Sequence, residues 1–345
     1  MKRILALIVS CALALSAAPA LAGTAGRTVT DVWGREIVIP DQVMRIACLG
    51  SGAPRIAAYL GVMDMLVGAE DYDIASMTVL RDYSPVYQEQ LAALPSVGAG
   101  GGSGSNNGYA EQLILAAPDV ILAGFSAEAA DELQRQTDIP VVAVRYISKG
   151  LANDTFYAAV RVFAQTVGAL ERGEKLLAYI DACKEDLSAR TRDVPDADKL
   201  TAYAGAVTFS GQHGFAGTYS RFGPFDAIHA INVADMPEVD GYYEADLEKI
   251  VVWDPDVIFL DPSNMGLVND EYAKNPDYFD SLRAVREQRV YTMPSFNHAG
   301  TNISYALINA YHAGKVLFPE QFADVDLEET AARILVEFLG RNTLD

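Results

Sequence analysis

The chain has 345 residues, half of them hydrophobic, and 46 acidic against 26 basic side chains give it a net charge of −20. This apolar content is enough for a large core and excludes an intrinsically disordered chain. The acidic balance excludes nucleic acid and anionic lipid headgroups as partners, because both would be repelled. It favours a soluble protein that docks on a basic surface.

The first 22 residues have the pattern of a secretory signal peptide. Lys2 and Arg3 precede an uncharged, mostly apolar run that ends in the small-x-small motif ALA at positions 20–22. The run is too short to cross a membrane, which takes roughly 20 apolar residues. A lipid anchor on Cys11 would leave only a stub of apolar sequence before it. We therefore expect residues 1–22 to be cleaved before Gly23, export to the periplasm, and no membrane insertion afterwards.

Two cysteines remain after the signal is removed. Cys48 lies in an apolar, strand-like run and Cys183 in a helical one. Their spacing is not that of a zinc site, and we expect both to be free, buried thiols.

The predicted elements alternate between strands and helices in both halves of the chain. In the first half we expect a strand pair around a turn at 28–39, strands at 45–49, 65–69, 120–123 and 141–144, and helices from 54, at 109–117 and at 127–137. In the second half we expect strands at 200–207, 257–260 and 289–293, and helices at 225–231, 246–253, 278–282, 304–317 and 326–339. This alternation is typical of parallel sheets with helices on both faces.

A segment without proline, residues 153–190, separates the two halves. Its apolar residues recur at helical spacing, which predicts one long helix, or two shorter helices broken near Gly173. At ~1.5 Å per residue an unbroken helix would exceed the length of one lobe. We therefore predict an α/β fold of two Rossmann-like lobes with parallel sheets, residues 23–152 and 191–345, joined by the helix 153–190, with a ligand cleft between the lobes.

The two halves also share a repeat. The segments EQLILAAPDVIL at 111–122 and EKIVVWDPDVIF at 248–259 align at a constant offset of 137 residues. A helix ends before each proline, because the residue that precedes proline avoids the right-handed helical region, and the apolar run after it begins a strand. Two such corners in register, one on each side of the helical segment, predict a duplicated lobe.

In these features the chain resembles the helix-linked periplasmic substrate-binding proteins of ABC importers for iron–siderophore complexes, haem and cobalamin. The resemblance rests on the two repeated units, the connecting helix, and three segments: TVTDVWGREIVIP, RIACLGSGAPRIAAYLG and FDAIHAINVAD. It covers nearly the whole mature chain. It implies two lobes with a shallow cleft, little hinge motion, no catalysis, and delivery of a ligand to a permease and its ATPase. We expect the protein to be a monomer.

Glu111 and Glu248 occupy equivalent positions at the starts of the repeated helices. An acid in the first turn stabilises a helix through its dipole. The resemblance implies a second role, in which the glutamate of each lobe docks on basic residues of the permease, since complementary charges fix the orientation of an encounter.

The candidate ligand-binding residues are aromatic, cationic or imidazole side chains in loops and at strand ends. Aromatic rings with a polar tip suit a large, partly apolar ligand, and arginine forks suit the carboxylates or catecholates of an anionic chelate. Histidines on loops that follow strands should face the cleft, where they could contact a chelate or its metal. The predicted set is Arg55, Tyr72, Tyr109, Arg145, Tyr146, His213, Tyr219, Arg221, Tyr242 and His298. The glycine-rich loop 98–108 lacks the G-K-[ST] pattern of a nucleotide site and is expected at the cleft edge.

We expect the ligand to be an iron chelate of the siderophore type, carried as cargo, with no resident cofactor and no metal site of the protein's own. Haem is the second candidate, because His213, Tyr219 or His298 could supply an axial ligand. Cobalamin is neutral and would need few cations. A bare metal ion is disfavoured because acidic and histidine residues do not cluster at ligand spacing. A periplasmic hydrolase is the alternative from another class, although the chain has neither G-x-S-x-G nor H-E-x-x-H.

Overall fold

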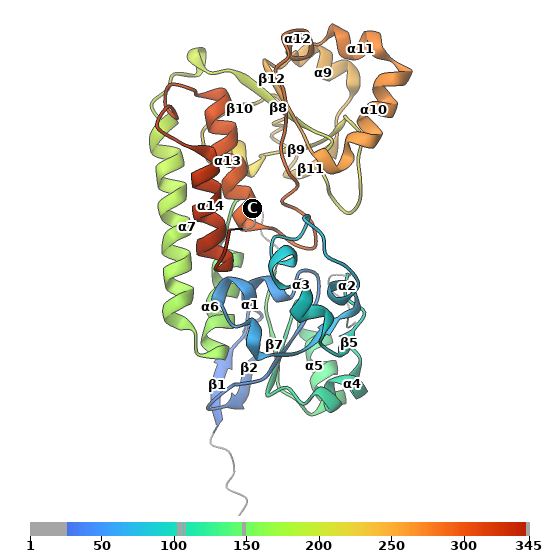
Figure 1. The fold of residues 1–345 in the computed structure, drawn as a ribbon, viewed down its shortest axis with the longest axis vertical. Coiled ribbons are helices and arrows are strands. Elements are labelled where there is room, and N and C mark those ends of the chain that lie inside the picture. The colour runs from blue at the N-terminus through green and yellow to red at the C-terminus, as the bar shows by residue number, and fades with distance from the viewer. Residues whose placement is uncertain (1–25, 102–105, 107, 147–149, 343–345) are drawn as a thin grey trace, which may run out of the picture.

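The computed structural model describes residues 26–101, 106, 108–146 and 150–342. It confirms the predicted α/β fold, with one parallel sheet in each half of the chain. Figure 1 shows two lobes stacked along the long axis of the molecule, with helix α7 (Leu170–Thr191) running beside both. The predicted signal peptide and its cleavage site lie outside the described residues.

The N-terminal lobe is built on five parallel strands in the order β5-β4-β3-β6-β7. The central strands β3 and β6 are buried along their whole length, as expected for strands covered by helices on both faces. The strands are β3 (Ile46–Leu49), β4 (Leu66–Glu70), β5 (Ser96–Gly98), β6 (Val120–Ala123) and β7 (Val141–Ala143), beside the antiparallel pair β1 (Gly26–Thr30) and β2 (Glu36–Pro40). The helices are α1 (Pro54–Leu60), η1 (Met63–Met65), α2 (Asp71–Ile74), α3 (Ser84–Ala92), α4 (Ala110–Ala116) and α5 (Ala127–Thr137).

The C-terminal lobe is built on four parallel strands in the order β10-β8-β12-β13. A separate antiparallel pair, β9 and β11, contacts this sheet at β8. The strands are β8 (Thr201–Gly205), β9 (Gly217–Ser220), β10 (Ile231–Asn232), β11 (Gly241–Glu244), β12 (Val257–Leu260) and β13 (Val290–Thr292). The helices are η2 (Asp196–Asp198), α8 (Gly223–Asp226), α9 (Leu247–Trp253), η3 (Pro262–Asn264), α10 (Met265–Lys274), α11 (Pro276–Ser281), α12 (Arg283–Arg286), α13 (Ile303–Leu317) and α14 (Leu327–Leu339).

The two segments that repeat in the sequence also have the same local structure. Helices α4 and α9 both end on a residue with left-handed backbone, Ala117 with φ 47° and Asp254 with φ 37°. In each lobe the aspartate after the proline then accepts a hydrogen bond from an amide at the start of the neighbouring strand: Asp119 from Arg45, just before β3, at 2.9 Å, and Asp256 from Thr201, the first residue of β8, at 2.8 Å. The same helix–corner–strand unit therefore builds both lobes.

The connecting segment 153–190 is two helices rather than one. Helix α6 (Asp154–Val167) ends at Gly168, whose φ of 76° supplies the left-handed cap, and α7 then packs back against α6. Gly173, where we expected a break, lies inside α7, and a side chain there would crowd Ala164 of α6. The break therefore falls at the glycine that terminates a helix, and the second glycine allows the two helices to approach closely.

The last helix returns to the N-terminal lobe, although we predicted it as part of the C-terminal lobe. Helix α14 packs against α1 and α13. The Phe338 ring meets the edge of Tyr59 with centroids 4.7 Å apart, and Arg172 of α7 forms an ion pair with Glu337. One hydrophobic core consequently includes residues from both lobes and from the helices beside them.

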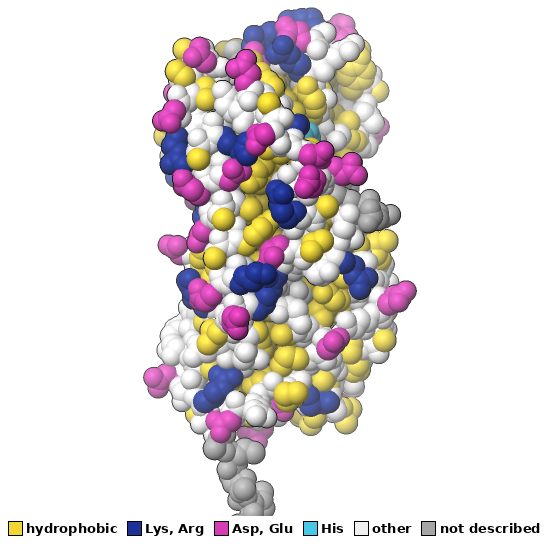
Figure 2. Space-filling model, turned by 60° about the vertical axis from the view of Figure 1, so that its left-hand side comes forward, with side chains coloured by type: hydrophobic (Ala, Val, Ile, Leu, Met, Phe, Trp, Pro, Cys, Tyr) yellow, Lys and Arg dark blue, Asp and Glu magenta, His cyan; other side chains and the backbone are white. Residues whose placement is uncertain are grey.

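Cys48 and Cys183 are confirmed as free, buried thiols. Burial raises the pKa of the Cys48 thiol, so it stays protonated at neutral pH. Figure 2 shows acidic and basic side chains interspersed over the face that it turns forward, so on this face the negative charge is not gathered into one patch. In the part of the chain that the structure describes, no helix combines the length and hydrophobicity needed to cross a membrane.

Candidate functional site

A cleft of about 600 Å³ lies between the two lobes. The N-terminal half of the chain contributes Ser51 and Gly101 from loops that follow β3 and β5, Tyr72 from helix α2, which follows β4, and Gly150. The C-terminal lobe contributes residues within the segments 208–211, 219–223, 240–242 and 296–301. Ligands of open parallel sheets bind in this crevice outside the carboxyl ends of the strands. The cleft is therefore the candidate ligand site.

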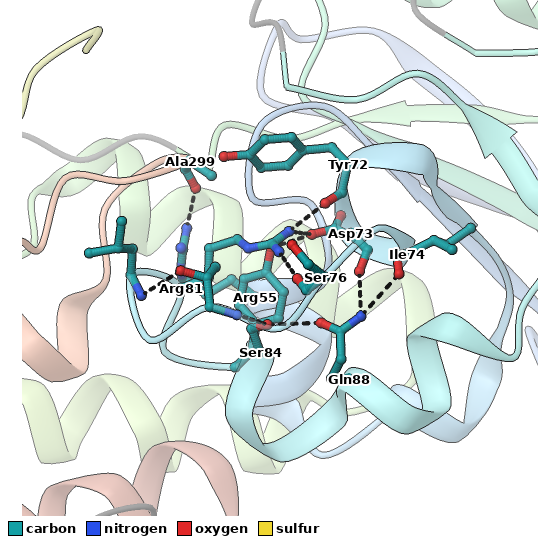
Figure 3. A network of polar contacts seen from close by, with 12 residues as sticks. Arg55, Tyr72, Asp73, Ile74, Ser76, Arg81, Ser84, Gln88 and Ala299 are labelled. Atoms are coloured by element: carbon teal, nitrogen blue, oxygen red, sulfur yellow. Dashed lines mark hydrogen bonds and ion pairs between the residues drawn. The ribbon is translucent and has the colours of Figure 1, made fainter. Parts of the chain in front are cut away.

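The floor of the cleft is a polar junction between the lobes, built around Arg55. Its guanidinium is buried, pairs with Asp82 at 3.0 Å, and donates hydrogen bonds to the Ala299 carbonyl and the Asn302 side chain, each at 2.7 Å. Figure 3 shows the Arg55–Ala299 contact that ties the first lobe to this segment of the second. Arg55 therefore holds the segment 298–302 and is not among the residues that line the cleft, so its contact with a ligand stays a prediction.

A second arginine holds one wall of the cleft. Arg81 pairs with Asp73 at 2.6 Å, donates to the Tyr72 carbonyl, and lies over the Tyr72 ring at 4.7 Å (Figure 3). The Tyr72 hydroxyl in turn lies 2.9 Å from Nε2 of His298 in the other lobe. Two of the predicted residues, 226 positions apart in sequence, thus form a polar contact across the cleft.

The surroundings of His298 lower the pKa of its imidazole below the ordinary 6.5, through partial burial first and then through the charges of Arg81 and Arg55. As the pH falls, the unfolded chain takes up this proton before the native protein does, so the native state loses stability below about pH 6.5. We expect the His298 imidazole to titrate below 6.5 by NMR, with its signals assigned by their loss in His298→Gln. The free energy of unfolding of His298→Gln should also fall less than that of wild type between pH 7 and 5. A titration midpoint of His298 at or above pH 6.5 would contradict its partial burial beside Arg81 and Arg55.

Aromatic rings form the opposite wall, in the C-terminal lobe. Phe209 stacks on Tyr242 with ring centroids 4.9 Å apart, and Tyr219 meets Phe209 edge-on at 6.1 Å. All three rings line the cleft. They present both apolar faces and phenolic hydroxyls to a ligand.

His213 contacts the residues of this wall and does not line the cleft. Its Nδ1 lies 2.6 Å from the Tyr242 hydroxyl and 3.0 Å from Glu244, and its Nε2 lies 2.7 Å from the Phe209 carbonyl. Both ring nitrogens are thereby engaged within the lobe, and the residue is not among those that line the cleft. A contact between His213 and a ligand stays a prediction, and it would require His213 to give up one of these neighbours.

Arg221 is the predicted arginine that the structure does place at the cleft. Its backbone is held at φ 56° by a 2.7 Å hydrogen bond from its amide to Asp235. A non-glycine residue in this conformation is disfavoured by about 1 kcal/mol or more, and such residues are enriched at functional sites. Among the described residues, no carboxylate lies within ion-pair distance of its exposed guanidinium. The side chain is thus available to an anionic ligand.

Besides Arg55 and His213, three more of the predicted residues do not line the cleft. Tyr109 is exposed and donates to Asp71, and Arg145 lies over the Trp33 ring at 5.5 Å. Tyr146 is buried, with its hydroxyl on the Leu122 carbonyl. All three follow strands or precede a helix, as a cleft residue would, but their side chains point elsewhere. Conversely, the sequence analysis missed Ser51 and the backbone of segment 299–301, whose only signal was their place after a strand.

The described residues contain no group of three or more His, Cys, Asp or Glu side chains placed to hold a metal ion. Glu111 and Glu248 lie exposed in the first turns of α4 and α9, outside the cleft, one on each lobe.

Comparisons with known proteins agree with this architecture. The chain is 26% identical over 350 residues to the molybdate-binding protein MolA of Haemophilus influenzae, covering 94% of this chain and 93% of that protein. The structure of MolA bound to molybdate matches with a TM-score of 0.66 at 21% identity, covering 92% of this chain and 98% of that one. A TroA-like periplasmic binding protein, FepB from Veillonella parvula, matches with a TM-score of 0.66 at 18% identity, covering 91% and 97%.

These structural matches show the fold, and the family follows from the sequence. Residues 46–296, well over half of the chain, match the family described as periplasmic binding protein. The resemblance drawn from the repeated units and the opening segments is thereby confirmed. The chain belongs to the periplasmic binding proteins, the solute-binding components of ABC importers.

Proposed function

We propose that this protein captures a ferric chelate of the siderophore type in the periplasm and delivers it to the permease and ATPase of an ABC importer. The observation that carries the proposal is the cleft of about 600 Å³, with aromatic rings on one wall and Arg221 at its edge. Pockets of roughly 300–1,000 Å³ suit organic ligands of drug size. An iron chelate offers a partly apolar shell to the rings and negative charge to the guanidinium.

An oxyanion such as molybdate is the second candidate, because MolA of Haemophilus influenzae is a molybdate-binding protein. Arg221, with the hydroxyls of Ser51 and Thr208 at the cleft, offers groups for an anion. A tetrahedral oxyanion would fill only a small part of the cleft, which is why we rank it second.

Haem is a weaker candidate, because the tyrosines of the cleft are poorly suited to bind its iron. Binding ferric haem through a tyrosine requires the phenolate, and burial raises the pKa of Tyr219 to about 12. His298 is engaged with Tyr72, and His213 lies behind the wall. A haem would therefore have to displace existing contacts.

The proposal is tested by titrating the purified protein against a panel of ligands while following its intrinsic fluorescence. The panel contains a ferric catecholate, a ferric hydroxamate, molybdate, haemin and cobalamin. Saturable, tight binding of a ferric chelate supports the proposal. Tight binding of molybdate, haemin or cobalamin with no response to either ferric chelate would replace it with that ligand.

Replacing Arg221 with Ala should weaken binding of an anionic ferric chelate by about 10- to 100-fold, because a hydrogen bond to a charged group contributes about 1.5–3 kcal/mol. Arg145→Ala is the matched control, since Arg145 is an exposed arginine that lies over Trp33 outside the cleft lining. Its dissociation constant should stay within about twofold of wild type. Equal affinities of the two variants would show that Arg221 does not contact the ligand.

A further inference from the structure

A second, much smaller cavity, of about 20 Å³, adjoins the cleft in the C-terminal lobe. It lies at the carboxyl ends of β8, β12 and β13. Five of the residues that line it also line the cleft: Thr208, Tyr219, Phe222, Phe296 and Asn297. A cavity needs about 10–15 Å³ to hold one water molecule, so this one has room for a single group of about that size. A ligand in the cleft can therefore reach it with one small substituent.

The lining of this small cavity includes a buried carboxylate, that of Asp261, which directly follows β12 and is 5% exposed. It accepts hydrogen bonds from the Thr208 hydroxyl at 2.7 Å, from the Ser263 amide at 2.9 Å and from the Ser263 hydroxyl at 2.6 Å. In the part of the chain that the structure describes, no lysine, arginine or histidine forms an ion pair with it. Buried carboxylates are usually paired with a cation, and a carboxylate has about four acceptor positions. Asp261 therefore retains its charge and an acceptor position without a cation of the protein's own.

The side chains around Asp261 have no hydrogen left to donate. The hydroxyl hydrogens of Thr208 and Ser263 are both directed to its carboxylate. The buried Asn264 uses its amide nitrogen on the Ala206 carbonyl at 2.7 Å and on the Thr208 hydroxyl oxygen at 3.1 Å. Its amide oxygen has no hydrogen-bond partner among the described residues. Since acceptors remain and the donors of these three side chains are engaged, the group favours a ligand that donates hydrogen bonds.

The cleft therefore offers groups of both charges to one ligand. The exposed guanidinium of Arg221 suits the negative oxygens of a chelate, whereas Asp261 suits a cation. An anion placed at Thr208 would have to draw its hydrogen away from Asp261 and would be repelled by that carboxylate. The small cavity is consequently a poor site for an oxyanion and a suitable one for a small cationic donor.

We propose that the cavity at Asp261 is a subsite for a primary ammonium group carried by the ferric chelate. The inference rests on the proposed function and narrows it to chelates that have both negatively charged chelating oxygens and a protonated amine. An ammonium group is compact, carries one positive charge and has three hydrogens to donate. A neutral hydroxyl is equally small, but it has one hydrogen and no charge, and hydrogen bonds between ionised groups are roughly twice as strong as neutral ones.

The test compares two ligands that differ only at the amine. One is the ferric complex of a linear trihydroxamate that ends in a primary amine, and the other is the same complex with that amine acetylated. Both are titrated calorimetrically into the mature chain at pH 7, where an alkylamine is protonated. We expect the complex with the free amine to bind about tenfold or more tightly, because a hydrogen bond to a charged group changes affinity by about 10- to 100-fold.

Asp261→Asn keeps the size of the side chain and removes its charge. It should weaken binding of the amine-bearing complex and leave the acetylated complex unchanged, so the ratio of the two affinities falls to about threefold or less. Asp246→Asn is the matched control, because Asp246 also accepts a hydrogen bond from the amide two residues later, at 2.8 Å, but is exposed outside the cleft. It should keep the wild-type ratio. The acetylated complex also reports whether Asp261→Asn has folded.

Equal affinities of the wild-type chain for the two complexes would overturn the subsite and leave the proposed function intact, and this comparison does not depend on the folding of any variant. A preference for the free amine that persists undiminished in Asp261→Asn would trace it to the bulk of the acetyl group, and would likewise overturn the role of the carboxylate. If the wild-type chain binds neither complex and no other ferric chelate, the proposed function fails, and the subsite fails with it.

Discussion

Arg55→Met is expected to lower the free energy of unfolding by about 3–5 kcal/mol, because it leaves the Asp82 carboxylate buried without its cation. The loss extends beyond the ion pair. Arg55 also donates to Ala299 and Asn302, so the segment that carries His298 loses its anchor to the first lobe. We expect ligand affinity to fall together with stability. Urea denaturation followed by tryptophan fluorescence measures the first effect, and ligand titration of the folded variant measures the second.

The control for Arg55 is an ion pair of the same chemistry at the surface. Arg161 pairs with Glu174 at 2.8 Å between α6 and α7, and both side chains are about half exposed. Exposed pairs of this kind contribute about 0–1 kcal/mol, so Arg161→Met should change stability by no more than that. If the two variants lose similar amounts, the Arg55–Asp82 pair is not the junction between the lobes that its burial indicates.

Phe338→Ala is expected to destabilise the protein by about 3–5 kcal/mol, because it removes a fully buried ring from the contact between α14 and α1. The ring packs edge-on against Tyr59 and also faces Tyr179 of α7. Its removal should therefore release the last helix from the N-terminal lobe. The measurement is the shift of the urea midpoint, with hydrogen exchange to localise the loss to α14.

Val336 provides a control on the same helix, since its side chain is about half exposed. Val336→Ala should change stability by about 0.5 kcal/mol or less. Protection of the α14 amides that survives in Phe338→Ala would mean that the helix is held by its contact with α13 rather than by the N-terminal lobe.

The secondary structure was largely predictable, because its signals are local. Strand 120–123 and helix 127–137 have the predicted bounds, since an apolar run after Pro-Asp and a Ser126 cap define them within a few residues. The elements that were missed, such as the pair β9–β11 and helix α10, carry weak patterns and owe their conformation to long-range pairing and packing. In the connecting segment, the sequence indicated a break near Gly173, whereas the first helix ends at Gly168 and Gly173 lies inside the second.

The residues of the candidate site were also predictable only in part. Loops after strands were expected at the cleft, and Tyr72, Tyr219, Arg221, Tyr242 and His298 do line it. Arg55 and Arg221 could not be distinguished from sequence, since both are arginines beside strand ends. The partners of Arg55, Ala299 and Asn302, lie 244 and 247 residues away, and such contacts leave no local pattern.

The sequence by itself determined the α/β class, the duplicated lobe and the family, because periodicity, proline corners and a fixed offset are properties of neighbouring residues. Only the tertiary structure decided which side chains face the cleft. It also decided that the last helix packs against α1 of the first lobe as well as against α13, and that matching aliphatic pairs, Ile114 and Leu115 on α4 and Val251 and Val252 on α9, remain exposed on both lobes. The physical reason is that burial and ion pairing depend on which distant segments come together, and this is fixed only when the whole core has formed.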